Sequence, residues 1–237
     1  MTQGESGSSD QLEMIENLET VKHVLLDLNG TLVVGTYPDW GSILEGELKL
    51  RRRGEARVTM EGLRRVARGE LTFEAYIRGI YEVQDVEGVT DAAFRIYSSY
   101  VRLREDAISV LEKLKERYDL SLCSDTVGVA KEVIRRLDLI KYFKRTFFSC
   151  DLKNLKSEKD FWMKCLSNFP HSTPSEFVMI GDKPRPDVYW PKRIGLRTIL
   201  IKSAISSPQD WVDKPEGSAY EEPDARIETL KELLDLI

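Results

Sequence analysis

Continuous apolar stretches alternate with amphipathic stretches along most of the chain. The first apolar stretch covers residues 21–28 (VKHVLLDL) and contains β-branched residues, which favour strands. Further stretches of this kind cover residues 118–124, 145–150, 177–182 and 197–202. Short apolar runs bounded by polar turns are typical of strands that are covered on both faces. The pattern therefore predicts a buried strand at each of these places.

The amphipathic stretches between the strands have apolar residues at helical spacing. In residues 106–118, for example, Ile108, Leu111 and Leu114 fall on one helix face. Further helical segments are predicted over residues 128–143, 157–169 and 227–237. Strands that alternate with helices form βαβ units, which imply a parallel sheet with helices on both faces. We therefore expect an α/β fold with a doubly wound parallel sheet.

One long segment departs from this alternation. Residues 35–41 (GTYPDWG) interrupt the strand pattern with glycine, proline and aspartate, and residues 42–101 contain no apolar run of strand type. Instead, MEGLRRVARGE and LTFEAYIRGIYEVQ place apolar residues at helical spacing, and Thr72 suits the start of a helix. We therefore expect a core domain over residues 21–34 and 102–237, a helical cap domain over 35–101, and a flexible polar tail over 1–20.

The composition is that of an ordinary soluble globular protein, with 237 residues of which 41% are hydrophobic and 32% charged. No stretch of 18 apolar residues occurs, and the polar start lacks the features of a signal peptide. The net charge of -5 offers no broad attraction for nucleic acid. The cysteines are odd in number and lack CxxC spacing, which argues against disulfides or a zinc site: Cys123, Cys150 and Cys165. We expect a cytoplasmic protein that binds neither membranes nor nucleic acid.

Candidate chemistry lies at the carboxyl ends of three predicted strands. Asp27 ends the first strand, Ser124 and Asp125 end the second, and Asp182 and Asp187 follow the strand at 177–182. A lone carboxylate at such a place is a structural cap of the next turn about as often as it is a functional group. Parallel strands, however, bring their carboxyl ends to one edge, where open α/β sheets bind ligands. Clustered carboxylates repel one another and call for a cation, and an all-oxygen set favours Mg²⁺ over Zn²⁺.

Two further groups suit this acidic pocket to a phosphoryl group. The hydroxyl of Ser124 and the ammonium of Lys156 are donors that hold and neutralise phosphoryl oxygens. In this order and at these intervals, the residues resemble the motifs of the haloacid dehalogenase superfamily of phosphatases and related hydrolases. DLNGTL is similar to the first motif, which implies that Asp27 is the nucleophile that takes the phosphoryl group.

The remaining motifs follow along the chain. Ser124, with Asp125 beside it, stands at the second motif, which binds the phosphoryl oxygens. Lys156 in LKSEKDFW aligns best with the third-motif lysine, although further lysines lie close by at Lys153 and Lys159. GDKPRPD resembles the fourth motif, which implies that Asp182 ligates Mg²⁺ and Asp187 supports the metal site. The resemblance also implies a Rossmann-like core, a helical cap over the site and, because the site is capped, a small phosphorylated metabolite as substrate.

Asn29 departs from the pattern of the family. Its phosphatases usually carry a catalytic acid/base Asp at this position, two residues after the nucleophile, and an amide neither gives nor takes a proton at neutral pH. A positioned acid or base contributes roughly 10² to 10⁴ in rate. The metal site is expected to survive, because the family uses the backbone carbonyl of this residue as a ligand.

Two interpretations follow from Asn29. In the first, the protein is a phosphohydrolase that is slow or limited to good leaving groups, such as acyl phosphates, aryl phosphates or phosphoanhydrides. In the second, it is a non-catalytic protein that binds a phosphorylated metabolite or acts in regulation. We favour the hydrolase. A dehalogenase would also use an Asp nucleophile, but the GDxxxxD pattern indicates phosphoryl chemistry.

Other polar and aromatic residues of the chain allow two interpretations each. Tyr37 and Trp40, in the hinge near Asp27, either touch substrate or pack between cap and core. The histidines, His23 and His171, are best explained as structural, since no GxSxG motif accompanies them. No GxGxxG follows the first strand, which disfavours a dinucleotide-binding site. A group of cap arginines either steers an anionic substrate or, as we favour, forms solvated helix faces: Arg51, Arg52, Arg53, Arg64 and Arg65.

Overall fold

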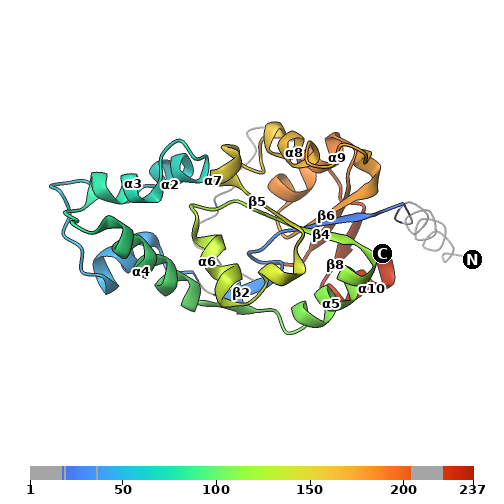
Figure 1. Cartoon of the computed structure of the whole chain (residues 1–237), viewed down its shortest axis with the longest axis horizontal. Coiled ribbons are helices and arrows are strands. Elements are labelled where there is room, and N and C mark those ends of the chain that lie inside the picture. Colours follow the sequence, from blue (N-terminus) through green and yellow to red (C-terminus); the bar gives the residue numbers. More distant parts are fainter. Residues whose placement is uncertain (1–17, 19, 36, 204–220) are drawn as a thin grey trace, which may run out of the picture.

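The computed structural model describes residues 18, 20–35, 37–203 and 221–237. Apart from Leu18 and Thr20, the predicted tail lies outside these residues. A parallel six-stranded sheet in the order β5-β4-β1-β6-β7-β8 forms the centre of the molecule (Figure 1). Its strands are β1 His23–Leu26, β4 Asp119–Ser124, β5 Arg145–Phe148, β6 Phe177–Gly181, β7 Arg197–Ile201 and β8 Ala225–Ile227.

Apolar side chains cover both faces of this sheet because neighbouring strand residues point to opposite sides. On β1, Val24 and Leu26 belong to a cluster with helices α5, α6 and α10, whereas Leu25 packs with Phe161 and Trp162 of α8. Figure 1 shows α8 and α9 above the sheet and α5 and α10 below it. These helices are α5 Ala107–Arg117, α6 Val129–Arg136, α8 Lys159–Leu166, α9 Trp190–Arg193 and α10 Leu233–Leu236. The predicted doubly wound α/β fold is confirmed.

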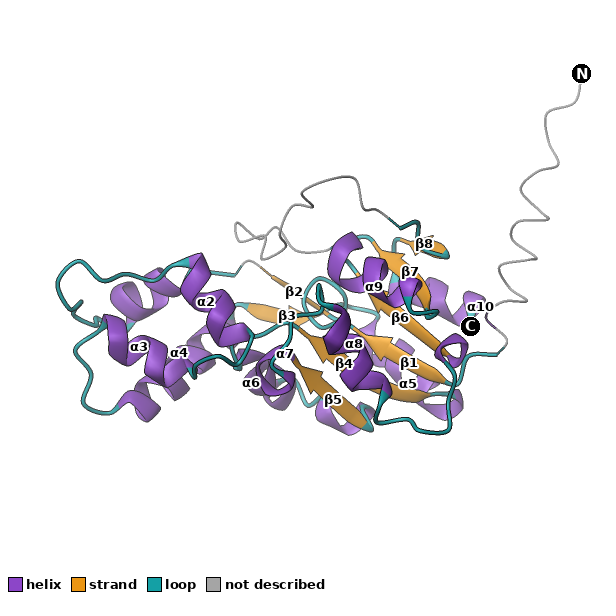
Figure 2. Cartoon of the chain, turned by 90° about the horizontal axis from the view of Figure 1, so that it is seen from above, coloured by secondary structure: helices purple, strands orange, loops and turns teal. Residues whose placement is uncertain are grey.

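The segment between the first strand and α5 is helical, as the sequence predicts. It begins and ends with an antiparallel pair, β2 Val33–Gly35 and β3 Val101–Leu103, which connects it to the sheet part in Figure 2. Thr72 caps the helix that starts at Phe73, since its side chain accepts a hydrogen bond from the Ala75 N–H at 3.1 Å. The helices are η1 Ser42–Glu47, α2 Met60–Ala67, α3 Phe73–Ile80 and α4 Val86–Ser99.

This helical segment has an apolar core of its own. The cluster includes Trp40, Leu63 and Phe73, and it extends to Val127 and Val129 at the start of α6. The cap therefore packs mainly on its own residues and contacts the sheet part through the loop after β4, through Leu155 and through the ion pair of Arg68 with Glu158. The domain boundaries at residues 35 and 101 stay a prediction.

Several element boundaries differ from the sequence predictions. The helix predicted over 128–143 ends at Arg136, and Asp138 then adopts a left-handed φ of 52°. The strand predicted over 145–150 ends at Phe148, where α7 Ser149–Leu152 begins. The closing helix predicted over 227–237 starts later, because Ile227 pairs with β7 as part of β8. Short strands such as β2, β3 and β8 form through distant partners and leave no readable local pattern.

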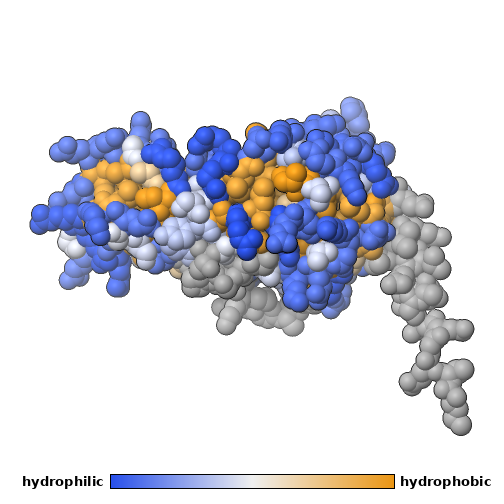
Figure 3. Space-filling model, turned by 90° about the horizontal axis from the view of Figure 1, so that it is seen from below, coloured by the Kyte–Doolittle hydropathy of each residue, from blue (hydrophilic) through white to orange (hydrophobic). Residues whose placement is uncertain are grey.

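The remaining short helices of the described part are η2 Ile140–Tyr142, η3 Pro174–Glu176, η4 Pro184–Tyr189 and η5 Leu230–Glu232. Figure 3 shows a largely hydrophilic face with apolar surface over both the cap and the sheet part. Among the described helices, none is long and apolar enough to cross a membrane.

Candidate active site

Asp27 lies immediately beyond β1, at the carboxyl edge of the sheet. Its backbone N–H donates to the Ile180 carbonyl at 2.9 Å, which continues the pairing with β6, and its side chain is buried. The chain then turns at Gly30, whose φ is +87°; a Cβ there would lie 2.1 Å from Oδ2 of Asp182. This turn therefore requires glycine, and it brings the loop after β1 against the acidic residue that follows β6.

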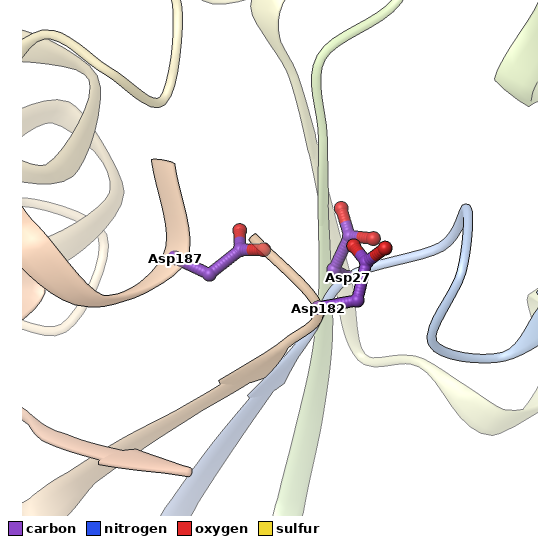
Figure 4. A group of neighbouring side chains, drawn as sticks. All are labelled: Asp27, Asp182 and Asp187. Carbon is purple, nitrogen blue, oxygen red and sulfur yellow. The ribbon is translucent and has the colours of Figure 1, made fainter. Parts of the chain in front are cut away.

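Three buried carboxylates meet at this edge. Asp27, Asp182 and Asp187 each offer an oxygen, and these atoms lie within 4.8 Å of one another. Figure 4 shows the carboxylates of Asp27 and Asp182 side by side, with Asp187 facing them from a separate segment. The Lys183 N–H donates to Asp187 Oδ2 at 2.9 Å and orients that side chain. Oδ1 of Asp182 is buried without a hydrogen-bond partner in the described part of the chain, as suits a metal ligand.

Lys156 reaches the same cluster from the loop before α8. It is 2% exposed, and its Nζ donates to Oδ1 of Asp27 and, at 2.6 Å, to Oδ1 of Asp187. Its backbone is held as well, because its carbonyl accepts a hydrogen bond from the Trp162 indole at 2.7 Å. Lys153 and Lys159 are exposed. Of these neighbouring lysines, Lys156 is therefore the one whose charge enters the site.

The charges in the site are out of balance, with one lysine ammonium among three buried carboxylates and the half-buried Asp125. Burial raises the pKa of Asp27 well above its usual range, and Asp187 and Asp182 raise it further against the opposing effect of Lys156. Burial likewise raises the pKa of Asp182 and of Asp125 to about 6 each. Burial alone would lower the pKa of Lys156, but the neighbouring carboxylates outweigh it and raise that pKa. An all-oxygen, electron-rich cluster of this kind fits a hard divalent cation.

The residues that end β4 lie beside this cluster. Ser124 is buried, and its hydroxyl lies 3.5 Å from the Asp125 carbonyl. Oδ1 of Asp125 accepts a hydrogen bond from the backbone N–H of Lys156 at 2.9 Å, which holds the lysine loop against β4. The substrate-binding roles of Ser124 and Asp125 stay predictions.

Asn29 is joined to the hinge of the cap. Oδ1 of Asn29 accepts a hydrogen bond from the Tyr37 hydroxyl at 2.7 Å. Tyr37 is 7% exposed, and burial raises the pKa of its phenol, so the hydroxyl remains a donor at neutral pH. Trp40 instead packs in the cap core. Tyr37 thus lies between the loop after β1 and the cap, as one of the two interpretations expects, whereas Trp40 packs within the cap.

Two of the cap arginines and one histidine have partners outside the acidic cluster. Arg52 pairs with Glu45, and Arg65 pairs with Glu70 on the cap surface. His23 contacts Ser172 at 2.9 Å, away from the site.

Two polar contacts of the site had not been anticipated from the sequence. The hydroxyl of Ser203 donates to Oδ2 of Asp182 at 2.5 Å, and Thr31 lies 3.4 Å from Oδ2 of Asp27. Ser203 is the second residue after β7, so its place at the carboxyl end of a strand was the available signal. Thr31 lies in the turn after β1 and is also fully buried.

A doubly wound sheet with an acidic cluster and one lysine at its carboxyl edge, next to a helical cap, defines a class of α/β hydrolytic enzymes. The family described as haloacid dehalogenase-like hydrolase matches residues 21–195. The chain belongs to this family and is a hydrolase. No curated protein matches it significantly.

Solved structures share the fold at low identity. A HAD phosphatase from Thermococcus onnurineus is 17% identical, with a TM-score of 0.59, over 91% of this chain and 97% of that chain. A 2-haloacid dehalogenase from Pseudomonas syringae is 21% identical, with a TM-score of 0.59 and the same coverage, 91% and 97%. A wild-type HAD family enzyme from Bacteroides thetaiotaomicron, in complex with magnesium and inorganic phosphate, is 18% identical with a TM-score of 0.57, over 81% and 97%.

Proposed function

We propose that the protein is a magnesium-dependent phosphohydrolase of a small phosphorylated metabolite and acts through an aspartyl phosphate on Asp27. The contact between the Lys156 ammonium and Asp27, inside a cluster with Asp182 and Asp187, carries this proposal. A dehalogenase needs an Asp nucleophile but no such set of additional carboxylates. The Bacteroides relative, which is in complex with magnesium and inorganic phosphate, supports the same choice.

In the first step, an oxygen of Asp27 attacks phosphorus and the bond between phosphorus and the leaving oxygen breaks. Lys156 holds Asp27 in place and balances the charge that gathers on the phosphoryl oxygens. Ser124 offers its hydroxyl to one of those oxygens from the end of β4. Asp27, Asp182 and the backbone carbonyl of Asn29 would hold Mg²⁺ with the support of Asp187, and the bound cation would neutralise phosphoryl charge.

In the second step, water releases phosphate from Asp27. A carboxylate at position 29 would take a proton from that water, whereas the Asn29 amide cannot. We therefore propose slow turnover and a preference for leaving groups that depart without a proton, such as carboxylates and phenolates. The same residue favours the alternative of a non-catalytic phosphometabolite-binding or regulatory protein, which the experiment below separates from the hydrolase.

We also propose where the cap lies, which substrates it admits and where the protein is located. The cap of residues 35–101 would cover the site and limit it to small substrates rather than nucleic acid. A cytoplasmic location is supported by the three cysteines, which are all free.

The test compares phosphate release from 4-nitrophenyl phosphate and from glycerol 3-phosphate, with and without Mg²⁺. Wild type should cleave the aryl ester in a magnesium-dependent way, and Asp27→Asn should abolish the reaction. Asn29→Asp should raise the rate of alkyl ester hydrolysis by a factor of roughly 10² or more. Asp160→Asn, at an exposed position on α8, is the matched control and should behave as wild type. Magnesium-dependent phosphate binding without turnover in wild type and Asn29→Asp would instead establish the non-catalytic protein.

A further inference from the structure

The hydroxyl of Tyr37 is directed at the side chain of Asn29. It donates a hydrogen bond of 2.7 Å to Oδ1, and Tyr37 is 7% exposed. A tyrosine hydroxyl bound in this way occupies the acceptor branch of the carboxamide. The other branch of the same planar group is the amide nitrogen, which only donates hydrogen bonds.

The cap holds Tyr37 in this orientation. Its ring stacks on Tyr97 of α4, with ring centroids 5.1 Å apart and an interplanar angle of 29°. Tyr97 in turn stacks on Trp40, with centroids 4.6 Å apart and an angle of 12°, and Trp40 is 1% exposed in the cap core. A phenol fixed through such a stack loses little freedom when it makes its hydrogen bond. The orientation of Asn29 therefore depends on packing that belongs to the cap.

We propose that Tyr37 is a positioning residue that holds Asn29 with its amide nitrogen free to donate toward the reacting oxygens. This inference rests on the proposed function and deepens it. In the first step, the bond between phosphorus and the leaving oxygen breaks, its electron pair stays on that oxygen, and a bond from phosphorus to Asp27 forms. A donor at position 29 stabilises this departing anion, which needs no proton.

The same orientation leaves the second step without a base. Water attacks phosphorus, the bond to Asp27 breaks, one water proton stays on the released phosphate and the other goes to solvent. Because Asn29 accepts no proton, the phosphorylated Asp27 decays slowly and accumulates during turnover. The substrate class that follows is one with an anionic leaving group, such as acyl and aryl phosphates.

The test is a double-mutant cycle between Tyr37→Phe and Asn29→Ala. Tyr37→Phe deletes the donor and keeps the ring stack. With 4-nitrophenyl phosphate and Mg²⁺, it should lower kcat/KM, which reports the first step, about tenfold in the Asn29 background, the equivalent of one hydrogen bond. In the Asn29→Ala background it should change kcat/KM by less than about twofold, because its effect passes through Asn29. Equal losses in both backgrounds would overturn the inference.

Tyr142→Phe is the matched control for loss of a buried hydroxyl. Tyr142 is 5% exposed and donates to Oε1 of Glu112 at 2.8 Å, so it resembles Tyr37 in burial and bonding but lies away from the site. Tyr142→Phe should leave kcat/KM unchanged in either background. Thermal melts of each variant separate lost folding from lost positioning.

The same double-mutant cycle is then measured on the affinity for inorganic phosphate, by calorimetry with Mg²⁺. It separates failure of the proposed hydrolase from failure of the proposed role of Tyr37. Coupling in phosphate affinity without any turnover would retain the role of Tyr37 and reject the hydrolase. Turnover without coupling in either measurement would retain the hydrolase and reject the role of Tyr37. Absence of both would reject the two proposals together.

Discussion

Replacement of Lys156 by methionine should destabilise the protein strongly, because its ammonium offsets the charge of buried carboxylates. Lys156 is 2% exposed, and both partners, Asp27 and Asp187, are buried as well. Methionine keeps an unbranched chain of similar length and removes only the charge and its donors. What remains is a group of buried, mutually repelling acids.

The expected size of this effect follows from the burial. Removal of one partner from a buried ion pair costs about 3 to 5 kcal/mol, because the remaining charge stays uncompensated. For a chain of this length, each kcal/mol lowers Tm by roughly 2 to 4 °C, so the total loss is on the order of 6 to 20 °C. Mg²⁺ should restore part of the loss in Lys156→Met, since a bound cation also neutralises carboxylates.

Thermal melts followed by circular dichroism, with EDTA and then with excess Mg²⁺, measure both effects. Lys159→Met is the matched control, because Lys159 is exposed on the neighbouring helix, and it should melt within a degree or so of wild type. If Lys156→Met melts no earlier than Lys159→Met in EDTA, the lysine is not the counter-charge that the buried acids require.

Three other predictions test the site and its scaffold. Gly30→Ala should lower the free energy of unfolding by at least about 1 kcal/mol, because φ is +87° and the new Cβ meets Asp182. Gly79→Ala, in open space on α3, should raise the free energy of unfolding by roughly 0.5 to 1 kcal/mol, and urea unfolding measures both changes. Mg²⁺ should raise the Tm of wild type but not of Asp182→Asn in thermal melts, and equal shifts would contradict a metal site there. Burial lowers the pKa of His23 from its usual 6.5, so the folded state favours the neutral ring. The neutral ring therefore contributes stability above pH 6.5, and this contribution is lost as the pH falls toward the folded-state pKa. Wild type should therefore lose stability relative to His23→Gln between pH 7.5 and 5.5 in urea unfolding, while exposed His171→Gln keeps the full pH dependence; parallel curves for wild type and His23→Gln would refute this.

The strands and their terminal acids could be predicted because their signals are local. The apolar run before Asp27 and the run before Asp182 each indicate a buried strand that ends in a carboxylate, and parallel pairing then brings the two ends together. The helical cap was visible for a similar reason, since Thr72 and the apolar spacing after it mark a helix start. Strand β8 was missed because three residues at a sheet edge form a strand only through their partner β7.

The sequence by itself determined the fold class, the family and the candidate acids Asp27, Asp182 and Asp187, because each depends on short motifs and on the periodicity of neighbouring residues. The LKSEKDFW motif already favoured Lys156 among nearby lysines, but only the tertiary structure showed that it donates to Asp27 across 129 positions of chain. The tertiary structure also decided that Tyr37 orients Asn29 through a ring stack on the cap. Contacts of this kind depend on how separately formed elements pack, and no local pattern carries that information.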